Sequence, residues 1–261
     1  MRITFLGTCS GTEPVRDYRH VSFTIRHNDK IFFFDAGEGC SYTAHLIGID
    51  LLSTRAVFIT HCHMDHIGGL ENLLWNIRKL DGTAGADPPP MTGREVKVFI
   101  PDDVSREGVS KVLSATEGGF KTEFGIRMSL PEDGTIFEED GFKVSALHND
   151  HLGRDEKGRH LSFSYSIEAG GRTIVYSGDV KDVRELKPLL ANCSLLLMET
   201  GHHRVEDVCS YLKETAPGVK KLGFIHHGRA ILASPEGELK KAKDILGENV
   251  FLSRDRTALD I

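Results

Sequence analysis

His61-Cys62-His63-Met64-Asp65-His66 is the stretch that decides most about the fold of this 261-residue chain. It follows the apolar run 56–60 and precedes Gly68-Gly69, which places four potential metal ligands where a β-strand ends and a helix begins. A strand end fixes the direction of its last side chains, and the glycines permit a turn in which neighbouring ligands converge. The stretch therefore predicts a metal site, and its ligand count favours two ions over one.

The alternative interpretation is a solvated loop that happens to be rich in histidine. The strict alternation of ligands directly after a β-rich run disfavours that alternative. His61 and His63 share strand parity, so Cys62 between them points to the other side. We expect Cys62 to be a packing residue, because its thiolate would reach zinc only in a tighter turn.

Length and composition fit one soluble α/β enzyme domain over 1–261. The formal charge is -6, from 38 acidic and 32 basic residues, and no Lys/Arg run exceeds two, so the sequence lacks a broad electrostatic footprint for nucleic acid. Five cysteines without close pairs suit reduced thiols. The apolar run at 1–7 is too short for a signal peptide, and no stretch approaches the roughly 18 apolar residues of a membrane span. We expect a cytoplasmic protein without membrane contact.

Strand and helix patterns alternate through both halves of the chain, with no linker and no repeat visible in the sequence. Apolar spacing predicts one helix over 70–80, and Asp102 or Asp103 is placed to cap another that runs to Leu113. We predict two β-sheets packed face to face with helices outside. The predicted strands are 3–6, 21–25, 31–35, 56–60, 96–100, 142–147, 161–167, 173–176, 195–198 and 222–225; further predicted helices are 205–214 and 235–246; 81–93 is a predicted loop.

Later strand ends supply further candidate ligands. The run 144–147 leads into His148 and His151, the run 175–177 leads into Asp179, and the strand 222–225 leads into His226 and His227. Each of these residues alone would be as well explained by a structural role, for example a strand-end Asp that caps a turn. Their recurrence after apolar strands indicates that they complete the site begun at His61.

Imidazoles and carboxylates together suit zinc, with manganese or iron as other possibilities. A bridging carboxylate holds two ions about 3.5–4 Å apart, and Asp179 is the candidate bridge. Two such ions lower the pKa of a shared water toward neutrality and polarise the bond under attack. The predicted reaction class is metal-assisted hydrolysis through a hydroxide that bridges two divalent ions.

In order along the chain, Asp35, the 61–66 cluster, a following histidine, Asp179 and a late histidine resemble the motifs of the metallo-β-lactamase superfamily. The resemblance covers essentially the whole chain and implies a four-layer αββα sandwich. Asp35, in the segment 32–39, would support the ligand loop without binding metal itself. Carried over by position, the first metal would be bound by His61, His63 and His151, the second by Asp65, His66 and His226, and both by Asp179.

Two of these ligands have a neighbouring alternative. His151 is preferred to His148 because Asp150-His151 after the strand matches the family pattern, and His226 is preferred to His227 because it directly follows the strand. His148 and His227 stay open as the alternative ligands.

Both ends of the chain resemble ribonuclease Z and its phosphodiesterase relatives, through 4–14 and 251–255. His66 in place of a basic residue, and the absence of a cysteine at the bridging position, are unlike the zinc enzymes that open β-lactams. The flexible basic arm with which ribonuclease Z grips tRNA has no counterpart between Asp179 and Glu199. An acidic chain with few phosphate-neutralising cations is poorly suited to extended nucleic acid. We therefore favour a small phosphodiester substrate, a cyclic nucleotide or a short oligonucleotide, over tRNA 3′ processing.

The segment 199–204 lies where ribonuclease Z-like proteins carry a loop histidine that acts on the substrate. Either His202 or His203 could donate a proton, Arg204 or Arg229 could pair with phosphate oxygens, and Asp65 could combine metal binding with acid/base catalysis. The alternative for His202 and His203 is a surface loop before the helix 205–214.

Two other functions are compatible with the 61–66 motif. A lactone or thioester hydrolase would use the same ligands, and a non-enzymatic metal sensor could keep an inherited site. The ligand set is complete, which disfavours the sensor. The resemblance also makes a homodimer plausible.

Overall fold

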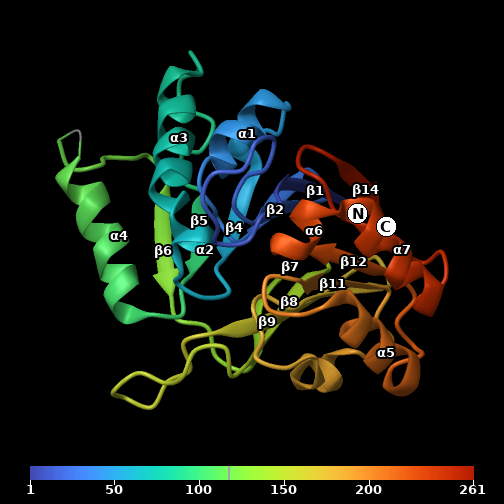
Figure 1. Cartoon of the computed structure of the whole chain (residues 1–261). Coiled ribbons are helices and arrows are strands. Elements are labelled where there is room, and N and C mark those ends of the chain that lie inside the picture. Colours follow the sequence, from blue (N-terminus) through green and yellow to red (C-terminus); the bar gives the residue numbers. More distant parts are fainter. Residues whose placement is uncertain (117) are drawn as a thin grey trace. The chain divides into compact units, whose positions relative to one another are not determined.

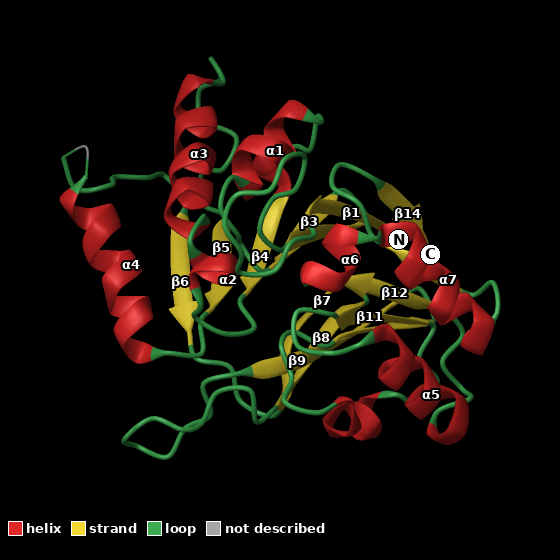
Figure 2. Ribbon diagram, in the orientation of Figure 1, coloured by secondary structure: helices red, strands yellow, loops and turns green. Residues whose placement is uncertain are grey.

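The computed structural model describes residues 1–116 and 118–261 and contains two mixed seven-stranded sheets with helices beside them (Figure 1, Figure 2). The described chain divides into two compact units that interleave along the sequence. The first unit is Met1–Gly7, Arg19–Pro131 and Asp255–Asp260; the second is Thr8–Tyr18, Glu132–Arg254 and Ile261. The single domain over 1–261 stays a prediction.

The first unit contains the sheet β14-β1-β2-β3-β4-β5-β6, whose neighbours are antiparallel from β14 to β3 and parallel from β3 to β6. Figure 2 shows its helices beside the parallel strands. The strands are β1 (Arg2–Gly7), β2 (Ser22–His27), β3 (Lys30–Phe34), β4 (Thr54–Phe58), β5 (Glu95–Phe99), β6 (Gly125–Ser129) and β14 (Ala258–Asp260). The helices are α1 (Cys40–Leu46), the 3₁₀ helix η1 (Leu51–Ser53), α2 (Met64–Ile67), α3 (Leu70–Thr83) and α4 (Asp103–Ala115).

One face of this sheet packs against its helices. The side chains of Leu70, Leu73, Leu74 and Ile77 recur on one face of α3, as their spacing predicts, and all four are buried in one cluster with strand residues such as Val98. Full burial of such a side chain contributes about 1.5–3 kcal/mol. Cys62 is partly buried against the same cluster, and burial raises the pKa of its thiol to about 11, in keeping with a packing role.

The other face of the sheet carries a ladder of phenylalanines. Phe23, Phe34, Phe58 and Phe99 lie on four adjacent strands, β2 to β5, and stack with ring centroids 5.0–5.1 Å apart. The first three rings are fully buried and Phe99 is nearly so. Both faces of the sheet are therefore apolar along β3 to β5, which fits the hydrophobic character of these strands.

The second unit repeats the strand pattern of the first. Its sheet β13-β12-β11-β10-β9-β8-β7 is parallel from β13 to β10 and antiparallel from β10 to β7. The strands are β7 (Gly134–Glu139), β8 (Phe142–His148), β9 (Phe163–Ala169), β10 (Arg172–Tyr176), β11 (Leu195–Glu199), β12 (Leu222–Ile225) and β13 (Val250–Leu252). The helices are the 3₁₀ helix η2 (Val183–Leu189), α5 (Val205–Thr215), α6 (Arg229–Ala233) and α7 (Pro235–Leu246).

The predicted class, an α/β protein with two sheets and flanking helices, is confirmed. The candidate site residues follow the strands in the way that the sequence indicates. Asp35 and His61 follow the parallel pair β3 and β4, whereas Asp179 and His226 follow β10 and β12, which run parallel within the other sheet. Carboxyl ends of parallel strands meet at one edge of a sheet, so each unit gathers its own set of candidate ligands there.

Some predicted boundaries were wrong. Strand β4 ends at Phe58, two residues before the predicted end, because the Thr60 amide leaves the ladder and donates to Asp35. The predicted loop 81–93 starts too early, because α3 continues to Thr83 and buried Asp81 accepts a hydrogen bond from the Met91 amide at 2.8 Å. The elements α1, η1, β6, β7, η2, α6, β13 and β14 were not predicted.

No helix in the part of the chain that the structure describes is long and apolar enough to cross a membrane.

Candidate metal centre

The first set of candidate ligands lies on the loop after β4. His61 is fully buried, and His63 is the N-cap residue of the short helix α2, which carries Asp65 and His66. The ring centroid of His61 lies 4.5 Å from that of His63 and 4.0 Å from that of His66. Asp65 Oδ2 is 3.4 Å from His66 Nε2. The first unit therefore brings its four predicted ligands together, three imidazoles and one carboxylate.

Asp35 fixes this loop through hydrogen bonds. Its buried carboxylate accepts hydrogen bonds from the Thr60 amide at 2.7 Å and from the Thr60 hydroxyl at 3.0 Å, and it lies 2.8 Å from His66 Nδ1. A carboxylate can only accept, so His66 Nδ1 donates and Nε2 keeps its lone pair for a metal. The supporting role predicted for Asp35 matches these contacts. Thr60, which also lies 3.1 Å from His61 Nδ1, was missed because the sequence assigned it to the strand.

Two glycines let the ligand loop pack against the segment after β3. A Cβ on Gly69 would lie 2.4 Å from the Gly37 carbonyl oxygen, and a Cβ on Gly37 would lie 2.6 Å from the Asp65 carbonyl oxygen. Neither distance is tolerable for a side chain. Gly69, after the histidine cluster, thus serves close backbone approach to Gly37, which positions α2.

The second set of candidate ligands surrounds Asp179, which follows β10 and is 2% exposed. His151 Nε2 lies 3.8 Å from Asp179 Oδ2, and His226 Nδ1 lies 3.4 Å from Asp179 Oδ1. One ligand atom each from Asp179, Glu199, His202 and His226 lies within 4.8 Å of all the others, a spacing that could hold a metal ion. The second unit therefore also gathers imidazoles around a carboxylate.

Glu199 is a residue that the sequence reasoning missed. Its fully buried carboxylate accepts from the His202 amide at 2.9 Å and lies 3.1 Å from His202 Nδ1 and 3.7 Å from His226 Nδ1. Burial acts to raise the pKa of Glu199, but the hydrogen bond from His202 and the nearby His226 imidazole outweigh it and hold the pKa at about 2. The strand-end rule that selected Asp179 also applies to Glu199, which directly follows the buried apolar run 195–198.

The two candidate loop histidines have different surroundings. His202 is 47% exposed, its Nδ1 faces Glu199, and that hydrogen bond raises the pKa of its imidazole. His203 is turned inward, with Nε2 donating to the Val180 carbonyl at 3.0 Å. Only His202 is thus both held by a carboxylate and open to solvent.

Both pairs of alternative ligands also differ in position. His148 pairs with Asp133 at 2.6 Å and stacks on His160, with ring centroids 3.6 Å apart, whereas His151 faces Asp179. His227 is buried, and its Nε2 donates to the Ser253 carbonyl at 2.8 Å. Burial lowers the pKa of His227 to about 4. These contacts support His151 and His226 in the second set.

Both candidate phosphate-binding arginines make ion pairs. Two nitrogens of Arg229 contact the Glu13 carboxylate at 3.1 and 2.9 Å, and the hydrogen bond from Arg229 lowers the pKa of Glu13 to about 2. Arg204 pairs with Glu206 at 3.4 Å. All four side chains are partly or largely exposed, so each arginine keeps donors that could meet an anion.

The donors in both sets fit divalent metal ions. Neutral imidazole nitrogens and carboxylate oxygens are ligands for zinc, and the rings are oriented by neighbours, as metal-binding histidines are. Because His66 is held through Nδ1, its remaining nitrogen faces the ligand cluster.

Comparison with known proteins identifies the metallo-β-lactamase fold and its ribonuclease Z-like branch. A ribonuclease Z from Mycobacterium marinum is 26% identical over 289 residues, covering 100% of this chain and 99% of the relative. The crystal structure of the short form of human tRNase Z aligns with a TM-score of 0.75 at 19% identity, covering 100% of this chain and 99% of that chain. A metallo-β-lactamase fold protein, YhfI from Bacillus subtilis, aligns with a TM-score of 0.75 at 17% identity, covering 99% and 98%.

A family model gives the most specific match. The model described as "Anti-Pycsar protein Apyc1" matches residues 1–215, which include the first ligand set and the second set except His226. The chain therefore belongs to the Anti-Pycsar protein Apyc1 family, within the ribonuclease Z-like branch of the metallo-β-lactamase superfamily, and is a hydrolase.

Proposed function

We propose that this hydrolase cleaves a small phosphodiester, such as a cyclic nucleotide or a short oligonucleotide, with the help of about two divalent metal ions. The observation that carries the proposal is the loop at 199–203. It places a half-exposed histidine, His202, on a buried carboxylate, Glu199, beside the candidate ligand Asp179. A proton donor next to a cation site suits a substrate with a charged phosphate and an alkoxide leaving group.

The ligand assignment is part of this proposal. His61, His63 and His151 would hold one ion, Asp65, His66 and His226 the other, and Asp179 would contact both. When bound, two zinc ions, or manganese or iron in their place, would polarise the phosphodiester and lower the pKa of a water molecule toward neutrality.

The chain's own groups would move the protons. We assign His202 as the donor to the leaving oxygen, because Glu199 fixes its Nδ1 side and leaves Nε2 as the outward donor. Glu199 also stabilises the protonated ring, consistent with the raised pKa of His202. Asp65 would accept the proton of the attacking water through one carboxylate oxygen. His203 is given no catalytic role, since its Nε2 is committed to the Val180 carbonyl.

A second candidate function is tRNA 3′ processing. Its support is the full-length similarity to proteins named ribonuclease Z. The net charge of -6 disfavours it, because affinity for a long polyanion rises with the number of phosphates that the protein neutralises.

A substrate panel separates these functions. The metal-loaded protein is assayed against bis(p-nitrophenyl) phosphate, cyclic mononucleotides, short oligonucleotides, precursor tRNA, lactones and thioesters. We expect turnover of the small phosphodiesters. Cleavage confined to precursor tRNA would favour tRNA processing, and turnover of lactones or thioesters without any phosphodiesterase activity would overturn the proposal.

Variants test the assignment of the proton donor. We expect His202→Ala to lower kcat by about 10²- to 10⁴-fold, the usual contribution of a positioned acid. His148→Ala is the matched control, because His148 is also a partly exposed histidine on a carboxylate and lies outside the ligand sets. Equal losses in both variants would contradict a catalytic role for His202.

A further inference from the structure

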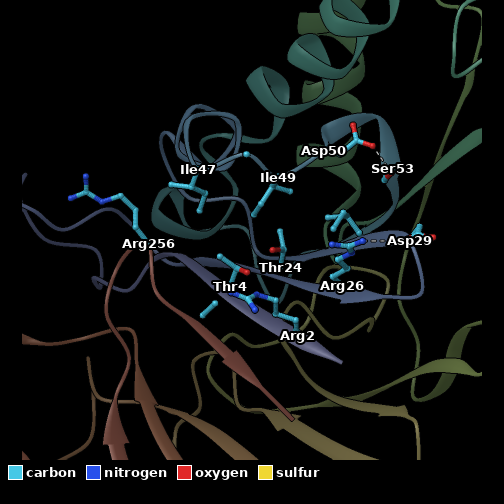
Figure 3. A pocket seen from close by; sticks show the side chains of 13 residues that line it. Arg2, Thr4, Thr24, Arg26, Asp29, Ile47, Ile49, Asp50, Ser53 and Arg256 are labelled. Atoms are coloured by element: carbon cyan, nitrogen blue, oxygen red, sulfur yellow. Dashed lines mark hydrogen bonds and ion pairs between the residues drawn. The ribbon is translucent and has the colours of Figure 1, made fainter.

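The first unit contains a cavity that none of the candidate ligands lines. Its volume is about 410 Å³. One wall is the sheet edge formed by β14, β1 and β2, and the other is the segment that joins α1 to η1 (Figure 3). Its lining includes Arg2, Thr4, Thr24 and Arg26 from the strands and Ile49 from the joining segment. Small-molecule sites in proteins typically have volumes of about 300–1,000 Å³.

The strand wall concentrates positive charge. Arg2 and Arg26 are direct partners in the antiparallel register of β1 and β2, so their side chains project from the same face. Like charges directly opposite each other destabilise a strand pair. Figure 3 shows both guanidinium groups over the strands beside Thr4 and Thr24. This arrangement favours an anion between or above the two arginines.

The neighbouring carboxylates satisfy the arginines only in part. Arg2 contacts Asp260 through one nitrogen at 3.3 Å, and Arg26 contacts Asp29 through one nitrogen at 2.9 Å. Each guanidinium has five N–H donors, so these contacts leave several for a ligand. Both arginine side chains are more than half exposed, at 55% and 61%. The two guanidinium groups are thus available to an incoming oxyanion.

Two further charged residues, Asp50 and Arg256, line the cavity. The Asp50 carboxylate accepts hydrogen bonds from the Leu52 amide at 3.0 Å and from the Ser53 hydroxyl, and so caps η1. Arg256 lines the cavity and makes no ion pair with any residue that the structure describes. In the view of Figure 3 it stands at the opposite end from Asp29.

The opposite wall contributes apolar side chains beside Asp50 and Ser53. Ile47 and Ile49 come from the segment between α1 and η1. Ile31, on β3, adds a third branched side chain to the lining. Such a surface suits the flat face of a base or the carbon side of a ribose, whereas the guanidinium groups and threonine hydroxyls suit phosphate oxygens. We propose that this cavity binds a phosphorylated small molecule of mononucleotide size, at a site separate from the metal ligands.

Calorimetric titration of the metal-loaded full chain tests the proposal. The probes are adenosine 5′-monophosphate and its two parts, inorganic phosphate and adenosine. We expect the nucleotide to bind more tightly than either half. Arg26→Gln should weaken nucleotide binding about tenfold or more, the usual loss for a hydrogen bond to a charged group. Arg256→Gln is a second variant with a smaller expected loss, since that side chain stands at the end of the cavity.

Arg127→Gln is the matched control, because Arg127 is an exposed strand arginine on β6, at the opposite edge of the same sheet. Turnover of bis(p-nitrophenyl) phosphate without nucleotide should be the same in Arg26→Gln and in the parent. Binding that neither Arg26→Gln nor Arg256→Gln weakens, an equal loss in Arg127→Gln, or no binding in the millimolar range would overturn the proposal. The titration does not depend on catalysis, so its failure and failure of the proposed function are distinguishable.

Discussion

Asp35 and His226 share an uncommon backbone conformation. Each follows a buried strand and has a positive φ of 53°, a region that non-glycine residues seldom occupy. Strained residues of this kind persist where surrounding contacts hold them, often at functional sites. Here the turn aims the Asp35 carboxylate at Thr60 and His66, and aims the His226 ring at Asp179. The conformation directs each side chain toward its candidate ligand set.

We expect metal binding to depend on the negative charge of the Asp35 side chain and not only on its size. Asp35→Asn keeps the size of the side chain but loses the acceptor that fixes His66 Nδ1 as a donor. We expect metal affinity or activity to fall about 10- to 100-fold, the usual effect of losing such a support. Metal content by elemental analysis and phosphodiesterase kinetics measure it.

Asp133→Asn is the control, because Asp133 accepts from His148 in the same way at 2.6 Å, outside the ligand sets. Unchanged metal affinity in Asp35→Asn would contradict the supporting role.

Gly201 provides room for the His226 ring. A Cβ at this position would lie 2.7 Å from both Cε1 and Nδ1 of His226. We expect Gly201→Ala to displace the ring and lower kcat/KM by at least about tenfold, since small displacements of catalytic groups are costly. In Gly218→Ala, the matched control, the new Cβ meets no atom within 4 Å. A fully active Gly201→Ala would show that His226 need not hold its present position.

The strand-end pattern located most candidate site residues in the sequence, and its failures have physical causes. It found His61, Asp179 and His226 because a polar ligand after an apolar run is visible in one dimension. It missed Thr60, whose hydroxyl gains its role only when folding brings Asp35 beside it. It does not single out Glu199, because in the sequence this carboxylate stands in the same segment as His202 and His203.

At the scale of elements, long buried segments were predicted well and exposed ones poorly. The helix 235–246 and the strand 222–225 coincide with α7 and β12. Strands β6 and β7 were missed because their residues are largely exposed or partly exposed and lack a clear apolar alternation. The short helix α1 has only seven residues, too few for a helical period to be distinctive.

The Asp182 carboxylate caps the start of η2. Asp182 accepts from the Arg184 amide, and together with Glu185 it forms a capping box. The hydrogen bond from the Arg184 side chain lowers the pKa of Asp182 from 3.8 to about 2. Because the folded-state pKa is the lower one, the stabilisation is present above pH 3.8 and is lost as the pH falls toward 2.

We expect Asp182→Ala to lower the free energy of unfolding by about 1 kcal/mol at neutral pH, with a smaller difference as the pH falls below about 4. Chemical unfolding across this pH range measures the difference. Asp244→Ala is the control, because it removes only an exposed ion pair with Lys240. A loss that is the same at every pH would argue that the Asp182 charge makes no contribution.

At the scale of the whole molecule, six strands of each sheet share one connectivity that the sequence does not show. In each, three successive antiparallel strands, β1 to β3 or β8 to β10, lead into three further parallel strands. A strand order depends on which positions of each strand are apolar and not on which residues occupy them. The two sheets can therefore share it without a repeat in the sequence. Two candidate site residues fall after equivalent strands, the supporting Asp35 after β3 and the candidate ligand Asp179 after β10.

Elemental analysis of the purified full chain tests the central claim, that the ligand sets of both units serve one metal-dependent reaction. We predict about two divalent ions per chain, with loss of metal and of phosphodiesterase activity in both His63→Ala and His226→Ala. His160→Ala, which alters a histidine outside both sets, should retain the metal. A wild-type chain that holds one ion or none, or variants that keep both ions, would contradict the account.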